Sequence, residues 1–212
     1  MIKRILFDLD NTLIPWDDSN IKALIKTFQE VKIPFSVDRA EEYFKAMKSY
    51  EKHHSRFDKV EMSRWIGMKM SLDLPDDFIK RWTDKLCYCV PPKDEELISL
   101  LEYLSSKYSL CVVSNWFYNQ QRDRLKKYGI LEFFDKIYTA DKYDKKPYKE
   151  MYDLACDELD KSEVAMVGDD YTIDIKSAVD YGMSAFYLSK NARYCNKKTK
   201  IIRTMYDLRK YL

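Results

Sequence analysis

Two aspartates stand two residues apart where the first apolar segment of the chain ends. The segment Ile5–Phe7 is followed by Asp8 and then by Asp10. On an extended backbone, residues i and i+2 project to the same side, so both carboxylates would face one point in space. Like charges placed together repel, and the pair therefore favours a bound cation or a shared proton. The alternative is a solvated turn, because Asp and Asn are common turn residues.

A second acidic cluster follows another buried-strand pattern. Residues 164–168 are apolar and end in a glycine, and Asp169, Asp170 and Asp174 come after them. Carboxylates that converge from two strand ends suit a hard cation with oxygen ligands, most simply Mg²⁺. A calcium-binding loop is excluded because its D-x-D-x-D-G spacing and closing Glu are absent. The sequence therefore predicts a magnesium site.

Two further segments supply donors that a phosphoryl group requires. Ser114 and Asn115 end the apolar run 110–113, where a hydroxyl, backbone N–H groups and the start of the next helix can donate to phosphate oxygens. Lys146 precedes Pro147, which suits the first position of a helix and holds Lys146 extended. A lysine fixed in this way can neutralise charge on a transferring phosphoryl group.

These segments lie in an alternating pattern of strands and helices. Short apolar runs predict strands at Lys3–Asp8, Leu110–Ser114, Lys136–Ala140, Glu163–Gly168 and Ser184–Leu188. Helical patterns lie between them, at Glu95–Lys107, Asn119–Tyr128, Tyr148–Leu159 and Ile173–Tyr181. Apolar strands that alternate with helices are typical of a parallel sheet covered on both faces. The predicted fold class is α/β, with a Rossmann-like parallel sheet.

The stretch 16–90 breaks this alternation. It shows helical periodicity but no convincing strand, and Pro91-Pro92 marks the return to the alternating pattern. We therefore expect an α/β core of residues 1–15 and 91–212, with an α-helical domain of residues 16–90 inserted after the first strand.

Composition favours a soluble globular protein. The 212 residues are 46% hydrophobic and 34% charged, and the formal net charge is +2. No apolar run approaches the ~18 residues that a membrane span requires. The N-terminus lacks the regions of a signal peptide, so a cytoplasmic protein is expected. The five irregularly spaced cysteines favour reduced thiols without a metal.

The C-terminal segment is basic. From Lys190 to Leu212 it contains eight Lys or Arg residues and one acidic residue, Asp207. Such a segment can bind nucleic acid or another anionic partner. A solvated basic surface is favoured instead, because residues typical of a core are interspersed and no aromatic stacking platform accompanies the charges. We expect no nucleic-acid partner, no membrane association, and a monomer or weak dimer.

The four polar segments resemble the four motifs of the haloacid dehalogenase-like (HAD) hydrolase superfamily, in the family's order. Asp8, Asp10 and Thr12 match D-x-D-x-T, Ser114 matches the end of the second motif, Lys146 matches the lysine before proline, and Gly168, Asp169 and Asp174 match G-D-x-x-x-x-D. The resemblance extends from Lys3 to about Leu188. The family's dehalogenases carry an aromatic residue where Asp10 stands, so the resemblance favours the phosphatase branch. Asn11 replaces the usual glycine and tolerates left-handed backbone geometry.

The resemblance implies a magnesium-dependent phosphomonoester hydrolase acting on a small phosphorylated metabolite, either a sugar phosphate or a nucleotide. Asp8 would attack phosphorus and form an aspartyl-phosphate, while Asp10 would act as general acid and base. The implied phosphate-binding residues are Thr12, Ser114, Asn115 and Lys146, with Lys145 as the alternative to Lys146. The implied metal ligands are Asp8, the backbone carbonyl of Asp10, Asp169 and Asp174, with Asp170 as a further candidate.

The helical insertion falls where family members with a type 1 cap carry a mobile lid. Candidate lid contacts to substrate are His53, His54, Arg56, Arg64 and Trp65, although solvated Arg and His side chains and a packed Trp are favoured. Two alternatives to a phosphatase stay open. One is a phosphomutase using the same intermediate, and the other is a non-catalytic binding module that retains the fold.

Overall fold

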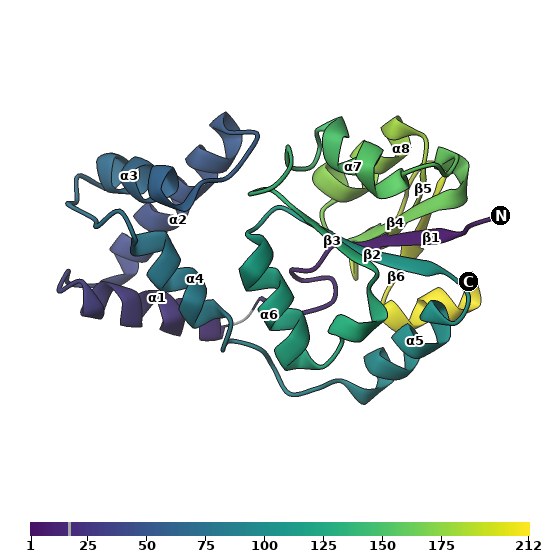
Figure 1. Cartoon of the computed structure of the whole chain (residues 1–212), viewed down its shortest axis with the longest axis horizontal. Coiled ribbons are helices and arrows are strands. Elements are labelled where there is room, and N and C mark those ends of the chain that lie inside the picture. Colours follow the sequence, from purple (N-terminus) through teal and green to yellow (C-terminus); the bar gives the residue numbers. More distant parts are fainter. Residues whose placement is uncertain (17) are drawn as a thin grey trace.

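The computed structural model describes residues 1–16 and 18–212, and a six-stranded sheet lies at its centre (Figure 1). The strands are β1 (Arg4–Phe7), β2 (Ser109–Ser114), β3 (Lys136–Thr139), β4 (Val164–Gly168), β5 (Ser184–Leu188) and β6 (Thr199–Ile202). Their order is β3-β2-β1-β4-β5-β6, and all neighbouring pairs are parallel. The predicted Rossmann-like parallel sheet is confirmed.

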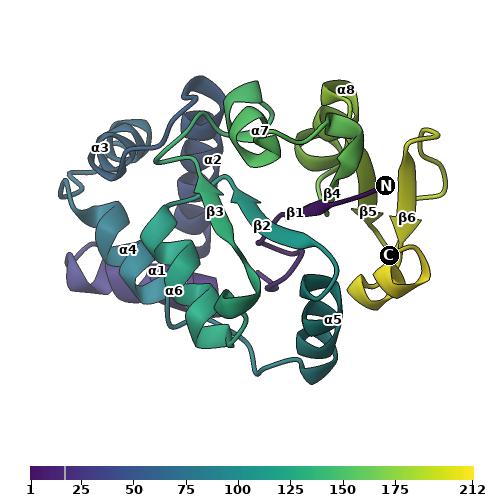
Figure 2. The same ribbon diagram turned by 45° about the vertical axis from the view of Figure 1, so that its right-hand side comes forward.

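Helices cover both faces of this sheet (Figures 1 and 2). One face carries α5 (Glu95–Ser105), α6 (Tyr118–Tyr128) and the 3-10 helix η4 (Met205–Lys210), and the other carries α7 (Lys149–Cys156) and α8 (Ser177–Tyr181). Short 3-10 helices, η1 (Leu131–Phe133) and η2 (Lys161–Glu163), precede β3 and β4.

The alternation of β1 shows why both faces can be covered. Ile5 and Phe7 pack into the hydrophobic cluster under α5 and α6, whereas Leu6 packs into the cluster under α7 and α8. Successive side chains of a strand point to opposite faces, and here all three are apolar and fully buried. A central strand in a two-sided core therefore has no polar face.

The strand β6 is absent from the sequence prediction. It pairs with β5 alone and forms the edge of the sheet opposite β3 (Figure 2). Its Ile202 is buried while Lys200 is exposed, and the preceding residues are basic. Short, charged strands are common at sheet edges because they resist pairing with other chains, and the charges mask the strand pattern.

Four helices lie between β1 and α5: α1 (Asp18–Glu30), α2 (Val37–His53), α3 (Lys59–Met70) and α4 (Phe78–Leu86). Within the described part of this stretch there is no strand, as the sequence predicts. The four helices pack around their own hydrophobic cluster, with Phe28, Tyr43 and Trp82 at its centre. Trp116 and Phe117, from the loop after β2, join the same cluster and connect the helices to the sheet.

Two predicted helices begin differently in the structure. The helix α7 begins at Lys149, so Pro147 lies before it and not at its first position, because the backbone N–H and C=O of Lys146 both bind the Asn115 side chain. The helix predicted at Ile173–Tyr181 begins as a π-helix, η3 (Tyr171–Lys176), and continues as α8. Among the described residues, no helix is long and apolar enough to cross a membrane.

Candidate active site

The predicted site residues meet at the carboxyl ends of β1, β2 and β4, where open α/β sheets bind ligands. They line a cavity of about 150 Å³. Its lining comprises Asp8, Asp10, Glu51, Ser114, Asn115, Trp116, Lys146, Asp169, Asp170, Ile173 and Asp174. Thr12 lies just outside this lining and donates a hydrogen bond from Oγ1 to Oδ1 of Asp169 at 3.4 Å.

A tight turn after β1 fixes the first pair of aspartates. The backbone N–H groups of Leu13 and Ile14 both bind the carbonyl of Leu9. Asn11 has φ 61°, in the left-handed region, and its Oδ1 accepts a hydrogen bond from the N–H of Trp16 at 2.9 Å. Asn adopts this conformation more readily than most residues, which explains why it can replace the usual glycine.

Three carboxylates and one lysine form the centre of the site. The carboxylates of Asp8, Asp169 and Asp174 each have a ligand atom within 4.8 Å of the others. Nζ of Lys146 lies 2.7 Å from Oδ1 of Asp8 and 2.5 Å from Oδ1 of Asp174. Lys146 is 2% exposed, and its ammonium group is held by these two carboxylates at the lining of the cavity.

The electrostatics of the cluster reflect burial and crowding. Burial, with help from Asp174 and Asp10, raises the pKa of Asp8 to about 7 against the opposing effect of Lys146. Burial and the charge of Asp8 raise the pKa of Asp169 to about 6. Burial opposes the charged form of Lys146, but Asp174 and Asp8 together raise its pKa above the ordinary value. The single positive charge of Lys146 is therefore too small to balance the negative charge of all three carboxylates.

The donor set fits Mg²⁺. Three carboxylates offer hard oxygen ligands from two loops, and because burial raises the pKa of Asp8 and of Asp169, a bound cation would stabilise their charged forms. Asp8, Asp169 and Asp174 are the residues that could hold the ion. The carboxylate of Asp10 is not one of these three, and the expectation that its backbone carbonyl is a ligand stays a prediction.

Asp170 serves the π-helix. Its Oδ1 accepts hydrogen bonds from the N–H groups of Thr172 and Ile173, both at 2.8 Å, and its own N–H donates to Oδ2 of Asp174 at 3.1 Å. An aspartate that caps a helix start in this way satisfies otherwise unpaired donors. Asp170 thus holds Asp174 in place, and π-helical turns are frequent at functional sites.

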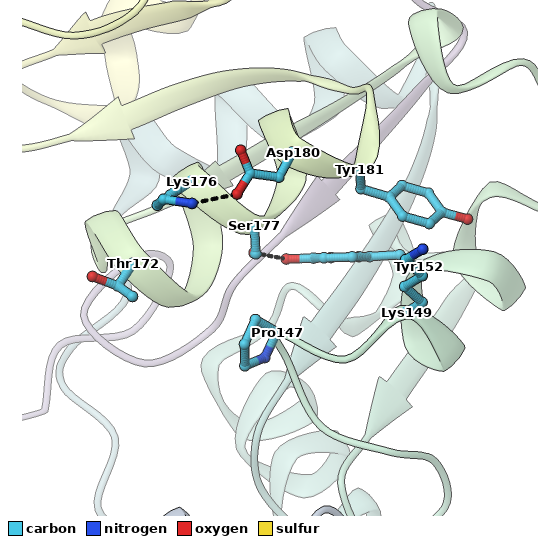
Figure 3. A pocket seen from close by; sticks show the side chains of 8 residues that line it. All are labelled: Pro147, Lys149, Tyr152, Thr172, Lys176, Ser177, Asp180 and Tyr181. Atoms are coloured by element: carbon cyan, nitrogen blue, oxygen red, sulfur yellow. Dashed lines mark hydrogen bonds and ion pairs between the residues drawn. The ribbon is translucent and has the colours of Figure 1, made fainter.

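A second cavity, of about 320 Å³, lies behind this segment, between α7 and the η3–α8 helix (Figure 3). None of the predicted site residues is part of its lining. Tyr152, at its base, is hydrogen-bonded to Oγ of Ser177 at 2.7 Å and donates to the carbonyl of Ile173. These contacts attach the π-helix to α7 and so support Asp174 from outside the site.

Two further residues expected to bind phosphate, Ser114 and Asn115, also line the cavity. Oγ of Ser114 accepts a hydrogen bond from Nε2 of Gln121 at 2.8 Å, so its own hydrogen can donate to a ligand. The side chain of Asn115 binds the backbone of Lys146 through both polar atoms, at 2.8 and 2.9 Å. Asn115 therefore positions Lys146. Nζ of the neighbouring Lys145 contacts the backbone carbonyl of Glu51 instead of the carboxylate cluster.

Two residues of the site were not expected from the sequence, Gln121 and Arg124 on α6. Nε2 of Gln121 donates to Oδ2 of Asp10 at 2.7 Å, and Arg124 forms an ion pair with Oδ1. Both share a helical stripe with Leu125 and Tyr128, and all four side chains are buried. Polar residues on the apolar stripe of a helix are the signal that could have found them.

The helical insertion contributes Glu51 to the cavity, and the five expected lid contacts lie elsewhere. Arg56 pairs with Asp144 and Glu150, and Arg64 pairs with Asp76. The imidazole of His54 stacks on a tyrosine, and His53 and Trp65 lie against each other. None of these five residues lines the cavity, so solvated surface charges and aromatic packing describe them better than contact with a substrate.

Fold and site together define the class of protein. The haloacid dehalogenase-like hydrolase family matches residues 5–188, and the chain belongs to this family. The match covers strands β1 to β5 apart from Arg4, the helical insertion and all four polar segments, so the resemblance noted in the sequence is confirmed.

Similar proteins span nearly the whole chain. The pyrimidine 5'-nucleotidase YjjG of Escherichia coli is 24% identical over 208 residues, covering 89% of this chain and 87% of its own. The ribulose-1,5-bisphosphate 5-phosphatase of Halopiger xanaduensis is 27% identical over 201 residues, covering 86% and 83%. The solved structure of YfnB from Bacillus subtilis superposes with a TM-score of 0.82 at 19% identity, covering 98% of this chain and 96% of that one.

Proposed function

We propose that this protein is a magnesium-dependent phosphomonoester hydrolase that acts on a small phosphorylated metabolite, a sugar phosphate or a nucleotide, through an aspartyl-phosphate on Asp8. One observation carries the proposal. The carboxylates of Asp8, Asp169 and Asp174 have ligand atoms within 4.8 Å of one another, and Lys146 bridges two of them. This is the arrangement needed to bring an anionic nucleophile to an anionic substrate.

The proposed reaction has two steps, and the positions of these side chains are consistent with both. A carboxylate oxygen of Asp8 attacks phosphorus and the bond from phosphorus to the leaving oxygen breaks. Asp10, which enters this step as the protonated carboxylic acid, gives its proton to the leaving oxygen and becomes a carboxylate. Water then attacks the phosphoryl group while Asp10 takes its proton, and the bond to Asp8 breaks to release inorganic phosphate. Ser114 and Lys146 hold the phosphoryl oxygens during both steps.

Mg²⁺, held by Asp8, Asp169 and Asp174, would supply positive charge that offsets the carboxylates and the phosphoryl oxygens. The closeness of these three carboxylates, which have ligand atoms within 4.8 Å of one another, supports this assignment. YfnB, a structural neighbour, has been crystallised bound to magnesium.

The relatives support phosphate-ester substrates. YjjG is named for a nucleotide and the Halopiger enzyme for a sugar bisphosphate, and each aligns with most of this chain. A cavity of about 150 Å³ holds a phosphoryl group, and a neighbouring cavity of about 230 Å³ shares Asn115 and Lys146 with it. The leaving group of a small metabolite would occupy this second space.

Residues 16–90 act as the cap in this proposal. Glu51 of α2 reaches the cavity, so the cap closes the site from above the strand ends and excludes water from the intermediate. The irregular spacing of the five cysteines favours reduced thiols and supports a cytoplasmic enzyme.

The test is hydrolysis of p-nitrophenyl phosphate with and without Mg²⁺ by the native protein and the variants Asp8→Asn and Asp153→Asn. Asp153 is an aspartate outside the site and serves as the matched control. We expect metal-dependent turnover that Asp8→Asn abolishes and Asp153→Asn retains. Turnover that survives the loss of Asp8 would sink the mechanism.

A further inference from the structure

The carboxylate of Asp10 is held from one side by the helix α6. Gln121 donates to Oδ2 at 2.7 Å, and Arg124 pairs with Oδ1. Nη1 of Arg124 also donates to Oε1 of Gln121 at 3.0 Å, so the two side chains support each other. Because residues i and i+3 lie on the same helical face, α6 presents both donors to Asp10 at once.

Burying the Arg124 side chain destabilises the fold, so packing alone does not explain why an arginine stands at this position. Its side chain is fully buried, and among the described residues no acceptor reaches its Nε or Nη2. A buried guanidinium with unpaired donors destabilises a fold unless its partner compensates, and an apolar residue is often better there. Asp10 is the carboxylate that pairs with it in the described chain, and the side chain of Asp10 is 18% exposed toward the cavity.

The same arginine is fixed from the other side by aromatic rings. Its guanidinium carbon lies 5.5 Å from the ring centre of Trp16, which stacks on Trp116 at 5.9 Å and 18°. Trp116 lines the cavity. A guanidinium between a carboxylate and an aromatic ring has little freedom to rotate. The donors that hold Asp10 are therefore themselves held rigidly.

We propose that Gln121 and Arg124 are positioning residues that orient Asp10 for proton transfer to the leaving oxygen. The inference rests on the proposed phosphatase function. Gln121 also donates to Oγ of Ser114 at 2.8 Å, so one side chain sets the spacing between the acid and the phosphate donor. With one lone pair of each Asp10 oxygen bound to α6, the remaining lone pairs are available to the cavity.

Leaving-group dependence separates positioning of the acid from a general structural role. An alkyl phosphate needs a proton on its leaving oxygen, whereas p-nitrophenolate leaves without one. We compare kcat/KM for p-nitrophenyl phosphate and glycerol phosphate in the native protein, Asp10→Asn, Arg124→Met, Arg124→Lys and Gln121→Leu. The ratio kcat/KM is chosen because it reports the steps up to loss of the leaving group.

Gln120→Leu is the matched control, because Gln120 is a buried glutamine of the same helix and no described residue hydrogen-bonds to its amide. We expect Arg124→Met to lower kcat/KM for glycerol phosphate by about 100-fold, the size of a general-acid contribution, and for p-nitrophenyl phosphate by less than about tenfold. Arg124→Lys should lower kcat/KM for glycerol phosphate less than Arg124→Met does. Gln121→Leu should also lower kcat/KM more for glycerol phosphate than for p-nitrophenyl phosphate. In Gln120→Leu, the ratio of the two kcat/KM values should equal that of the native protein.

Equal losses for both esters, or none in either positioning variant, would overturn the inference. If Arg124→Met does not fold, Gln121→Leu decides alone, since it removes hydrogen bonds and no charge. If the native protein is active and its activity depends on Asp8, but the Gln121 and Arg124 variants behave like Gln120→Leu, the positioning role is contradicted and the proposed function is not. A native protein that hydrolyses neither ester would overturn the proposed function as well.

Discussion

Gly168 leaves no room for a side chain beside Asp174. A Cβ built on Gly168 would lie 2.4 Å from Oδ2 of Asp174, far inside contact distance. Asp174 is buried, and it contacts both Lys146 and the backbone of Asp170, so it has nowhere to move without breaking these contacts. The glycine of the fourth motif is therefore needed to place the carboxylate of Asp174 in the proposed metal site.

Gly168→Ala should displace Asp174 and weaken the binding of Mg²⁺. We expect the Mg²⁺ concentration for half-maximal activity to rise by about tenfold or more, as for other changes next to metal ligands. The measurement is a Mg²⁺ titration of hydrolysis, with the melting temperature of the metal-free protein as the control for folding. An unchanged Mg²⁺ requirement in a folded variant would contradict the assignment of Asp174.

The adjacent lysines 145 and 146 differ in what they contact. Lys146 binds Asp8 and Asp174, whereas Lys145 contacts a backbone carbonyl of the cap. We expect Lys146→Met to lower kcat by about 10²–10³, the loss seen when a donor to a developing charge is removed. Lys145→Met, the matched control, should retain kcat within about tenfold of the native value. Equal losses would show that the contact geometry does not distinguish the two.

The residues of the four motifs could be predicted from the sequence because each follows an apolar run that must become a strand. The donors to Asp10 could not, since Gln121 lies 111 positions from Asp10 and only the folded sheet brings them together. The role of Asn115 was hidden for the same reason, as its partner Lys146 is 31 positions away. Contacts between distant segments depend on topology and not on local pattern.

Secondary structure was predictable where side chains repeat with a clear period. Five strands appear as apolar runs, but β6 does not, because its Lys200 and its basic neighbours hide Ile202. The π-helix η3 was expected as an ordinary α-helix, since one extra residue per turn depends on the cap made by Asp170 and not on periodicity. Edge strands and helix starts are therefore harder to predict from a sequence pattern than the central strands and helices.

The short helix η4 ends the chain and is held by a capping box. The carboxylate of Asp207 accepts hydrogen bonds from the backbone N–H groups of Arg203 and Thr204 at 2.8 and 3.1 Å. The hydrogen bond from Lys210 and these two backbone donors lower the pKa of Asp207 to about 2. Because the carboxylate is stabilised in the folded state, its contribution to stability is present above its ordinary pKa.

Asp207→Ala should therefore lower the free energy of unfolding by about 1 kcal/mol at pH 7, as for loss of a helix cap. The difference from the native protein should shrink as the pH falls below 3.8 and vanish only below about 2, where the native carboxylate becomes fully protonated. Urea unfolding at a series of pH values measures it. If the difference in unfolding free energy between the native protein and Asp207→Ala stays constant with pH, the stabilising group is not the ionised Asp207 carboxylate.

The whole chain has separate hydrophobic clusters under the cap helices and on the two faces of the sheet. Trp82 of α4 is fully buried and lies edge-on to Tyr43, Trp16 and Trp116, with ring centres 5.3 to 6.3 Å away. These rings connect the cap to the loop that follows Ser114. Their loss should affect the cap before the sheet.

Trp82→Ala should destabilise the protein by about 3–5 kcal/mol, the usual loss for a large buried aromatic residue. We expect amide hydrogen exchange to become faster throughout α1–α4 while β1, β2 and β4 retain their protection, because the sheet has its own core. The same measurement on the native protein is the reference. Equal acceleration in cap and sheet would show that residues 16–90 are not a separate domain.

The central claim is that Asp8 carries the phosphoryl group. The most direct measurement is a single turnover with Mg²⁺ and an excess of enzyme over substrate, stopped in acid within milliseconds to seconds, followed by mass spectrometry of the peptides. The account predicts one phosphoryl group on the peptide that contains Asp8, removable by hydroxylamine and absent from Asp8→Asn. Substrate turnover without that acyl-phosphate at any stage of the reaction, or with the group on another residue, would contradict it.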